Sequence, residues 1–132
     1  MANLSDILTP SGFTPVYTGL EEVGTITGTT LDLSTGSVFS HEPASNAFYE
    51  FSGVPALGTA FGFTLKVTPS ATISITWPSA GTNFAYVIWP DGVPAPAPAS
   101  GETSVYVFYT AGESGVGGGR PFYGFLAGEN MS

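Results

Sequence analysis

The fold is decided by residues 61 to 77, which read FGFTLKVTPSATISITW. From Phe61 to Val67 every second residue is apolar and the residues between them are small or polar, which is the period of a strand with one buried face. The same alternation returns from Ile73 to Trp77, after a turn at Pro69–Ser70. The two runs are therefore predicted to pair as a hairpin whose apolar faces match.

The rest of the chain supports an all-β fold. Residues 46 to 52 alternate in the same way, and residues 25–33 and 37–41 are predicted strands on either side of a Thr35–Gly36 turn. The 18 glycines and 11 prolines interrupt almost every window long enough for a helix, so only Asn3–Leu8 is typical of a short helical turn. The sequence predicts an antiparallel β-sandwich or a partly open barrel.

The domain organisation follows from the length and from the N-terminal residues. A chain of 132 residues fits a single domain with a sizeable core, and residues 20–132 are predicted to form a single antiparallel β domain. Residues 1–19 show little periodicity and are expected to be an N-terminal arm or a first strand. An arm that reaches a neighbouring subunit and a frayed terminus fit this segment equally well.

Charge and cysteine content exclude several classes of function. Only 9% of the residues are charged, against about a quarter in ordinary domains, and Lys66 and Arg120 are the only basic side chains in a chain of net charge −8. Nucleic acids and anionic membranes need a basic surface, so neither is an expected partner. The absence of cysteine excludes disulfides and thiol chemistry, and no apolar run is long enough to span a membrane.

Three later strands are apolar on both faces, which is unusual for a domain of this size. They are predicted at Phe84–Trp89, Val105–Tyr109 and Phe122–Leu126. A strand that is apolar on both sides must be covered on both sides, and a second subunit is the simplest way to cover the second side. The alternative is that these aromatic residues lie at the edges of a closed barrel. The chain is therefore expected to be an oligomer, and its candidate interface or glycan-contact residues are Trp77, Tyr86, Trp89, Tyr106, Phe108, Phe122 and Tyr123.

No arrangement of residues in the sequence predicts catalysis. Ser40–Glu42 contains the only histidine, but no nucleophile-elbow glycines surround it, and His41 is expected to be a surface residue at a strand end. Glu21 and Glu22 would point to opposite faces of an extended chain, so they do not form an acid–base pair. The sequence predicts no metal site and no cofactor.

Residues 90–99 are expected to be an extended Pro/Ala segment, and residues 111–120 a flexible loop.

An ordered set of short motifs carries a resemblance to a known group of proteins. The motifs are Asp32–Gly36 with Phe39, Phe63–Thr68, Thr76–Ser79, Trp89–Gly92 with Pro94, Val107–Thr110 and Phe122–Gly128. In this order they resemble a β module of tailed-phage virion proteins, which recurs in tail-fibre C-terminal regions and in small particle proteins. The resemblance covers Leu31 to Gly128. This chain departs from the pattern by the added apolar segment Ala80–Ile88, by its long glycine-rich loop and by Phe122 in place of a tryptophan.

The resemblance implies a non-enzymatic virion structural protein, located on the capsid surface or tail after assembly in the host cytoplasm. One expectation is a homotrimeric capsid decoration, or cement, protein that binds the major capsid protein or other virion proteins at junctions between capsomers. The alternative is a tail-fibre or receptor-binding module that recognises a host surface glycan. An enzyme such as a depolymerase is the third possibility, and it is disfavoured because no arrangement of residues in the sequence predicts catalysis.

Overall fold

The structure is a computed structural model of the chain and describes residues 23 to 132. The predicted arm at residues 1–19 lies outside the described residues. Strands hold 44% of the described part, and its helical content is two short 3-10 turns, so the prediction of a β-rich fold is confirmed. No helix among the described residues is long and apolar enough to cross a membrane.

The strands and turns follow in this order: β1 (Gly24–Ile26), β2 (Thr30–Asp32), β3 (Val38–His41), β4 (Ala47–Phe48), β5 (Glu50–Ser52), β6 (Phe61–Val67), β7 (Ile75–Thr76), β8 (Ala85–Ile88), η2 (Pro90–Gly92), β9 (Thr103–Thr110), η3 (Val116–Gly118) and β10 (Arg120–Met131).

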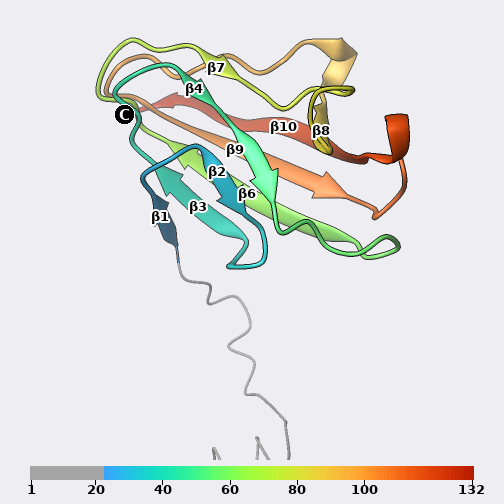
Figure 1. The fold of residues 1–132 in the computed structure, drawn as a ribbon. Coiled ribbons are helices and arrows are strands. Elements are labelled where there is room, and N and C mark those ends of the chain that lie inside the picture. The colour runs from blue at the N-terminus through green and yellow to red at the C-terminus, as the bar shows by residue number, and fades with distance from the viewer. Residues whose placement is uncertain (1–22) are drawn as a thin grey trace, which may run out of the picture.

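Six strands form the main sheet, in the order β1-β3-β6-β9-β10-β8 (Figure 1). The pairs β6–β9 and β9–β10 are antiparallel, whereas β1–β3, β3–β6 and β10–β8 are parallel. The sheet is therefore mixed, and the prediction of an antiparallel arrangement is wrong for three of its five pairings. Within the described residues the strands form no closed barrel.

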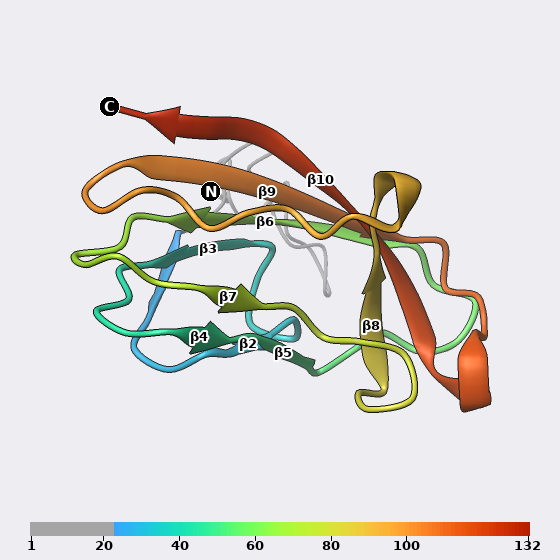
Figure 2. The ribbon, with the colours of Figure 1, turned by 90° about the horizontal axis from the view of Figure 1, so that it is seen from above.

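The short strands form a second set on one side of the main sheet. β4 and β5 are one extended run interrupted at Tyr49, and the run changes partner there, since β4 pairs with β7 and β5 pairs with β2. The Tyr49 amide donates to the Thr76 carbonyl and the next amide, of Glu50, donates to the Thr29 carbonyl, both at 3.0 Å. Figure 2 shows β2, β4, β5 and β7 alongside one another, opposite β3, β6 and β9.

The predicted hairpin between residues 61–67 and 73–77 is not formed. Both edges of β6 are occupied, by β3 and by β9, so no edge is left for β7, which pairs with β4. The chain after β6 stays bonded to the segment that follows β3, where the amides of Thr68 and Ser70 donate to the carbonyls of His41 and Pro43 at 3.0 Å.

The hydrophobic core lies between the main sheet and the short strands. Phe63 of β6 is at its centre, stacked on Phe108 at a centroid distance of 4.8 Å and in edge contact with Phe51 at 4.9 Å and Phe122 at 5.8 Å. Such aromatic pairs contribute about 0.5–1.5 kcal/mol each beyond their buried area. The alternation predicted for β6 is confirmed, because Phe63, Leu65 and Val67 are all buried.

Candidate functional site

Most of the residues expected to contact a partner or a glycan lie in the interior. Tyr106, Phe108 and Phe122 are 0% exposed, so they pack the core and cannot touch another molecule in this conformation. Trp77, Tyr86 and Trp89 are also buried. Tyr123 is the one member of the predicted set that reaches the surface, on β10.

Trp77 is the centre of a cluster of buried rings. Its indole stacks on Tyr49 with a centroid distance of 5.4 Å and packs against Tyr106 at 4.8 Å and Trp89 at 5.2 Å. The indole Nε1 donates a hydrogen bond of 3.0 Å to the carbonyl of Ala95. Trp77 therefore links the core to the segment that covers it.

That segment is the Pro/Ala stretch, residues 93–99, which follows the short turn η2 and has no regular secondary structure. Proline lacks an amide hydrogen, so such a segment offers mainly carbonyl acceptors. Two buried donors match them, because Trp77 binds the Ala95 carbonyl and the Tyr106 hydroxyl donates to the Pro96 carbonyl at 2.6 Å. Burial raises the pKa of Tyr106 to about 12, which keeps this hydroxyl protonated.

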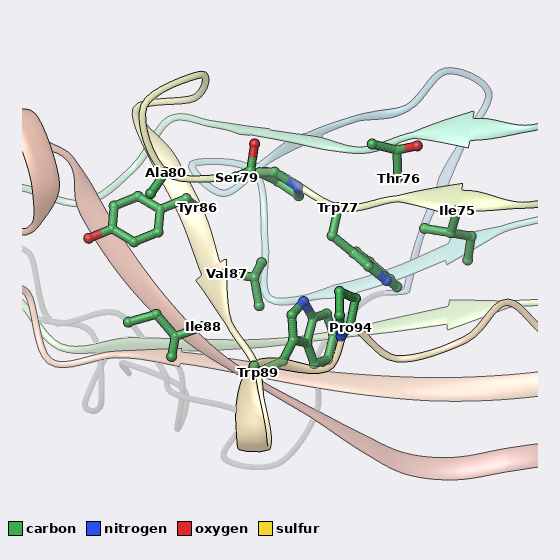
Figure 3. Close-up of a pocket in the computed structure, with 12 residues that line it drawn as sticks. Ile75, Thr76, Trp77, Ser79, Ala80, Tyr86, Val87, Ile88, Trp89 and Pro94 are labelled. Atoms are coloured by element: carbon green, nitrogen blue, oxygen red, sulfur yellow. The ribbon is translucent and has the colours of Figure 1, made fainter.

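A cleft of about 520 Å³ lies beside the cluster, between the segment after β7 and strand β8 (Figure 3). Its walls are mainly apolar, and the two tryptophans that line it are each only 7% exposed. Sugars stack on open ring faces, whereas these rings are almost wholly buried. The Tyr86 hydroxyl accepts a hydrogen bond of 2.9 Å from the Val116 amide.

The glycine-rich loop before β10 wraps around that hydroxyl. The Gly115 amide donates to the Gly119 carbonyl at 2.7 Å, and a Cβ atom on Gly115 would lie 2.0 Å from the Tyr86 oxygen. The loop that was expected to be flexible is therefore closed by a backbone bond of its own. It is tied to β8 by the bond from the Val116 amide to the Tyr86 hydroxyl and by a contact that only glycine allows.

One exposed apolar surface among the described residues is the side of the main sheet that faces away from the core, although other exposed apolar side chains, such as Phe48 and Leu57, lie outside the main sheet. We call this side of the sheet the outer face, and it carries Val38, Ser40, Thr64, Lys66, Ile88, Val105, Val107, Tyr109, Tyr123 and Phe125. The large members remain open, with Phe125 49% exposed, Tyr109 46% and Ile88 42%.

The outer face bears out the sequence observation that β8, β9 and β10 carry apolar residues on both sides. The sequence predicts contacts at Tyr106 and Phe108, whereas the alternation of β9 places their neighbours Val107 and Tyr109 outside. Strand periodicity separates the two sets, but it does not say which set faces the core. Exposed Tyr109 and Phe125 are the residues that the sequence analysis missed.

The basic side chains have different environments. Arg120 is buried, its Nη1 donates to the Pro55 carbonyl at 2.5 Å, and its guanidinium lies 5.7 Å from the Phe84 ring centre. Lys66 is exposed on the outer face. Since the sequence holds two basic residues, Lys66 is the only exposed lysine or arginine of the protein.

His41 is buried, not at the surface as the sequence analysis expected. Its Nδ1 lies 2.7 Å from the Tyr49 hydroxyl, and burial lowers the pKa of the imidazole. Ser40 points to the outer face, so the neighbouring hydroxyl is on the opposite side of the sheet. Residues 23–132 hold no group of three histidine or acidic side chains that could bind a metal ion.

Comparisons with protein-family models, with curated proteins and with solved structures found no match to this chain.

Proposed function

We propose that this protein is a non-enzymatic structural protein of a phage virion, and that it is a capsid decoration, or cement, protein bound at junctions between capsomers. The observation that carries the proposal is the outer face, where Phe125, Tyr109 and Ile88 are each close to half exposed. Large exposed apolar side chains grouped on one face of a sheet are typical of a contact with another protein. The assignment to a phage particle is supported by the order of the short motifs between Leu31 and Gly128.

The charge distribution supports a role in assembly. The outer face carries one charged side chain, Lys66, while the chain as a whole has a net charge of −8. Protein interfaces are depleted in charge at their centre and enriched in aromatic residues, which is the composition of this surface. We also interpret the two facing sets of strands as an open β-sandwich, a scaffold that can hold such a surface rigid.

Cryo-EM of the virion tests this proposal. We expect density of the size of this chain at repeated positions over capsomer junctions. Density confined to the tail, or no density for the chain in the particle, would contradict the assignment as a decoration protein.

A receptor-binding module is the second candidate, and the cleft beside Trp77 and Trp89 is the observation that favours it. A host glycan that binds there should be detected on a glycan array, and binding should disappear in Trp89→Ala. The matched control is Leu57→Ala, since Leu57 is exposed and does not line the cleft. Glycan binding that survives Trp89→Ala would place the contact elsewhere.

A further inference from the structure

The outer face has a regular arrangement that follows from the strand register. In one row Phe125, Val107 and Thr64 lie side by side on β10, β9 and β6. Two residues before Val107 on β9, Val105 lies beside Lys66 of β6. Two residues after Val107, Tyr109 lies beside Tyr123 of β10. Val107 is therefore midway between Lys66 and Tyr123.

Opposite charges lie at the two ends of this surface, and the negative one comes from the loop that borders it. At one end is Lys66, the only exposed lysine or arginine. At the other end the Tyr123 hydroxyl donates a hydrogen bond of 2.8 Å to Oε1 of Glu113, which fixes a carboxylate beside the tyrosine. The Glu113 bond also raises the pKa of Tyr123, so the hydroxyl remains a donor. From strand spacing and rise, the Cα atoms of Lys66 and Tyr123 are roughly 16 Å apart.

We propose that the outer face binds the outer face of a second copy of this chain, related by a two-fold axis that lies in the interface and passes by Val107. With the axis perpendicular to the line from Lys66 to Tyr123, Lys66 of each copy meets Tyr123 and Glu113 of the other. A two-fold interface repeats each contact twice, so two such ion pairs form. This inference rests on the proposed function, since both assign the outer face to a protein contact. It replaces the homotrimer expected from the sequence with a pair of copies.

The same axis places the apolar side chains against one another. Phe125 of each copy lies over the Val105–Val107 stretch of the other, and the strands of the two sheets cross at a steep angle. Packing of two sheets near a right angle is one of the two usual arrangements. The row of Phe125, Val107 and Thr64 is thus the centre of the interface, from which water is excluded. The pairs of Lys66 with Glu113 form its rim.

The available area and the charges fit a second copy. Phe125, Tyr109 and Ile88 are each close to half exposed, and the two aromatic side chains each offer roughly 100 Å². With the partly exposed valines this gives a sizeable part of the ~800 Å² per partner that a stable interface buries. Two copies of a chain with net charge −8 repel each other. On the outer face, Lys66 of one copy can attract Glu113 of the other.

The solution mass of the full chain across a range of concentrations tests the inference. We expect a two-copy mass for the wild type and a one-copy mass for Phe125→Asp. Leu57→Glu is the matched control, because it adds a negative charge at an exposed apolar residue outside the sheet and should keep the two-copy mass. Circular dichroism and thermal unfolding confirm that both variants fold.

Charge reversal tests the pairing itself. Lys66→Glu and Glu113→Lys should each weaken association about tenfold, because each replaces two attractive contacts with two repulsive ones. The double variant should recover most of the affinity.

A one-copy or three-copy mass for the wild type, an unchanged mass for Phe125→Asp, or a double variant as weak as the singles would overturn the inference. These outcomes concern the protein in solution, so they are independent of where cryo-EM places the chain in the virion.

Discussion

The indole of Trp77 and the carbonyl of Ala95 are joined by a hydrogen bond of 3.0 Å that crosses from the core to the Pro/Ala segment. The tryptophan is itself fixed by the rings of Tyr49, Tyr106 and Trp89. A segment rich in proline has few amide donors of its own, so its position depends on donors from the core. The aromatic cluster therefore shapes the wall of the cleft as well as filling the interior.

Trp77→Phe should loosen this segment, because the change keeps an aromatic ring but removes the donor to Ala95. We expect a loss of about 2 kcal/mol in unfolding free energy in urea, from one hydrogen bond and part of a ring. Hydrogen exchange at the amides of Ala95, Ala97 and Ala99 should accelerate. Trp89→Phe is the control, since it removes the same ring volume from the same cluster and leaves the Ala95 bond in place. Equal exchange rates in the two variants would contradict this role for Trp77.

Gly115→Ala should destabilise the protein although the residue lies in a loop. The new Cβ would lie 2.0 Å from the Tyr86 oxygen and 2.9 Å from Cδ of Pro121, so the loop or the ring must move. We expect a cost of about 1–3 kcal/mol in thermal or urea unfolding. Tyr86→Phe in the same chain should recover part of it, because the hydroxyl is the closest obstacle. Gly36→Ala should be nearly neutral, since nothing lies within 4 Å of its added Cβ.

The alternation of residues 61–67 was enough to predict β6 and its buried face, because a side chain in a strand can point to only two sides. It could not predict the partners of β6. Residues 73–77 alternate as well, yet β7 pairs with β4, since β3 and β9 occupy both edges of β6. Pairing depends on residues distant in the sequence, which is also why the parallel pairs were not predicted.

The candidate site was predicted in outline only. The sequence shows that β9 is apolar on both sides, but two apolar sides look alike until the rest of the core is known. Tyr106 and Phe108 lie inside because the short strands supply Tyr49 and Phe51, whose rings are part of the same core. Tyr109 and Phe125 are left outside. The link from Tyr123 to Glu113 joins a strand to a loop, and no spacing in the sequence indicates it.

Phe63→Ala should be among the most damaging single changes. Phe63 is in contact with the rings of Phe39, Phe51, Phe108 and Phe122, so truncation leaves a cavity bounded by both sets of strands. We expect a loss of about 3–5 kcal/mol in the free energy of unfolding. Leu57→Ala, at a residue 64% exposed, should change stability by less than about 0.5 kcal/mol. A small effect at Phe63 would mean that the core is not packed as described.

His41 should make stability depend on pH in mildly acidic solution. Burial lowers the pKa of its imidazole below 6.5, so between the folded and unfolded pKa values the unfolded chain binds more protons. The stabilisation is complete above pH 6.5 and is lost as the pH falls through the folded pKa. We expect a lower urea midpoint at pH 5 than at pH 7.5. Asp32 does not interfere, because its hydrogen bonds to Ser34 lower its pKa from 3.8, outside this range.

His41→Gln isolates this contribution, because it keeps a polar group near the Tyr49 hydroxyl but does not titrate. The variant should be less stable than the wild type at pH 7.5, since the bond of His41 with Tyr49 is altered. Its urea midpoint should nevertheless change much less between pH 7.5 and pH 5, because this is the only histidine in the chain. If the variant keeps the pH dependence of the wild type, another group carries it, and the buried imidazole is not the acid-sensitive element of the core.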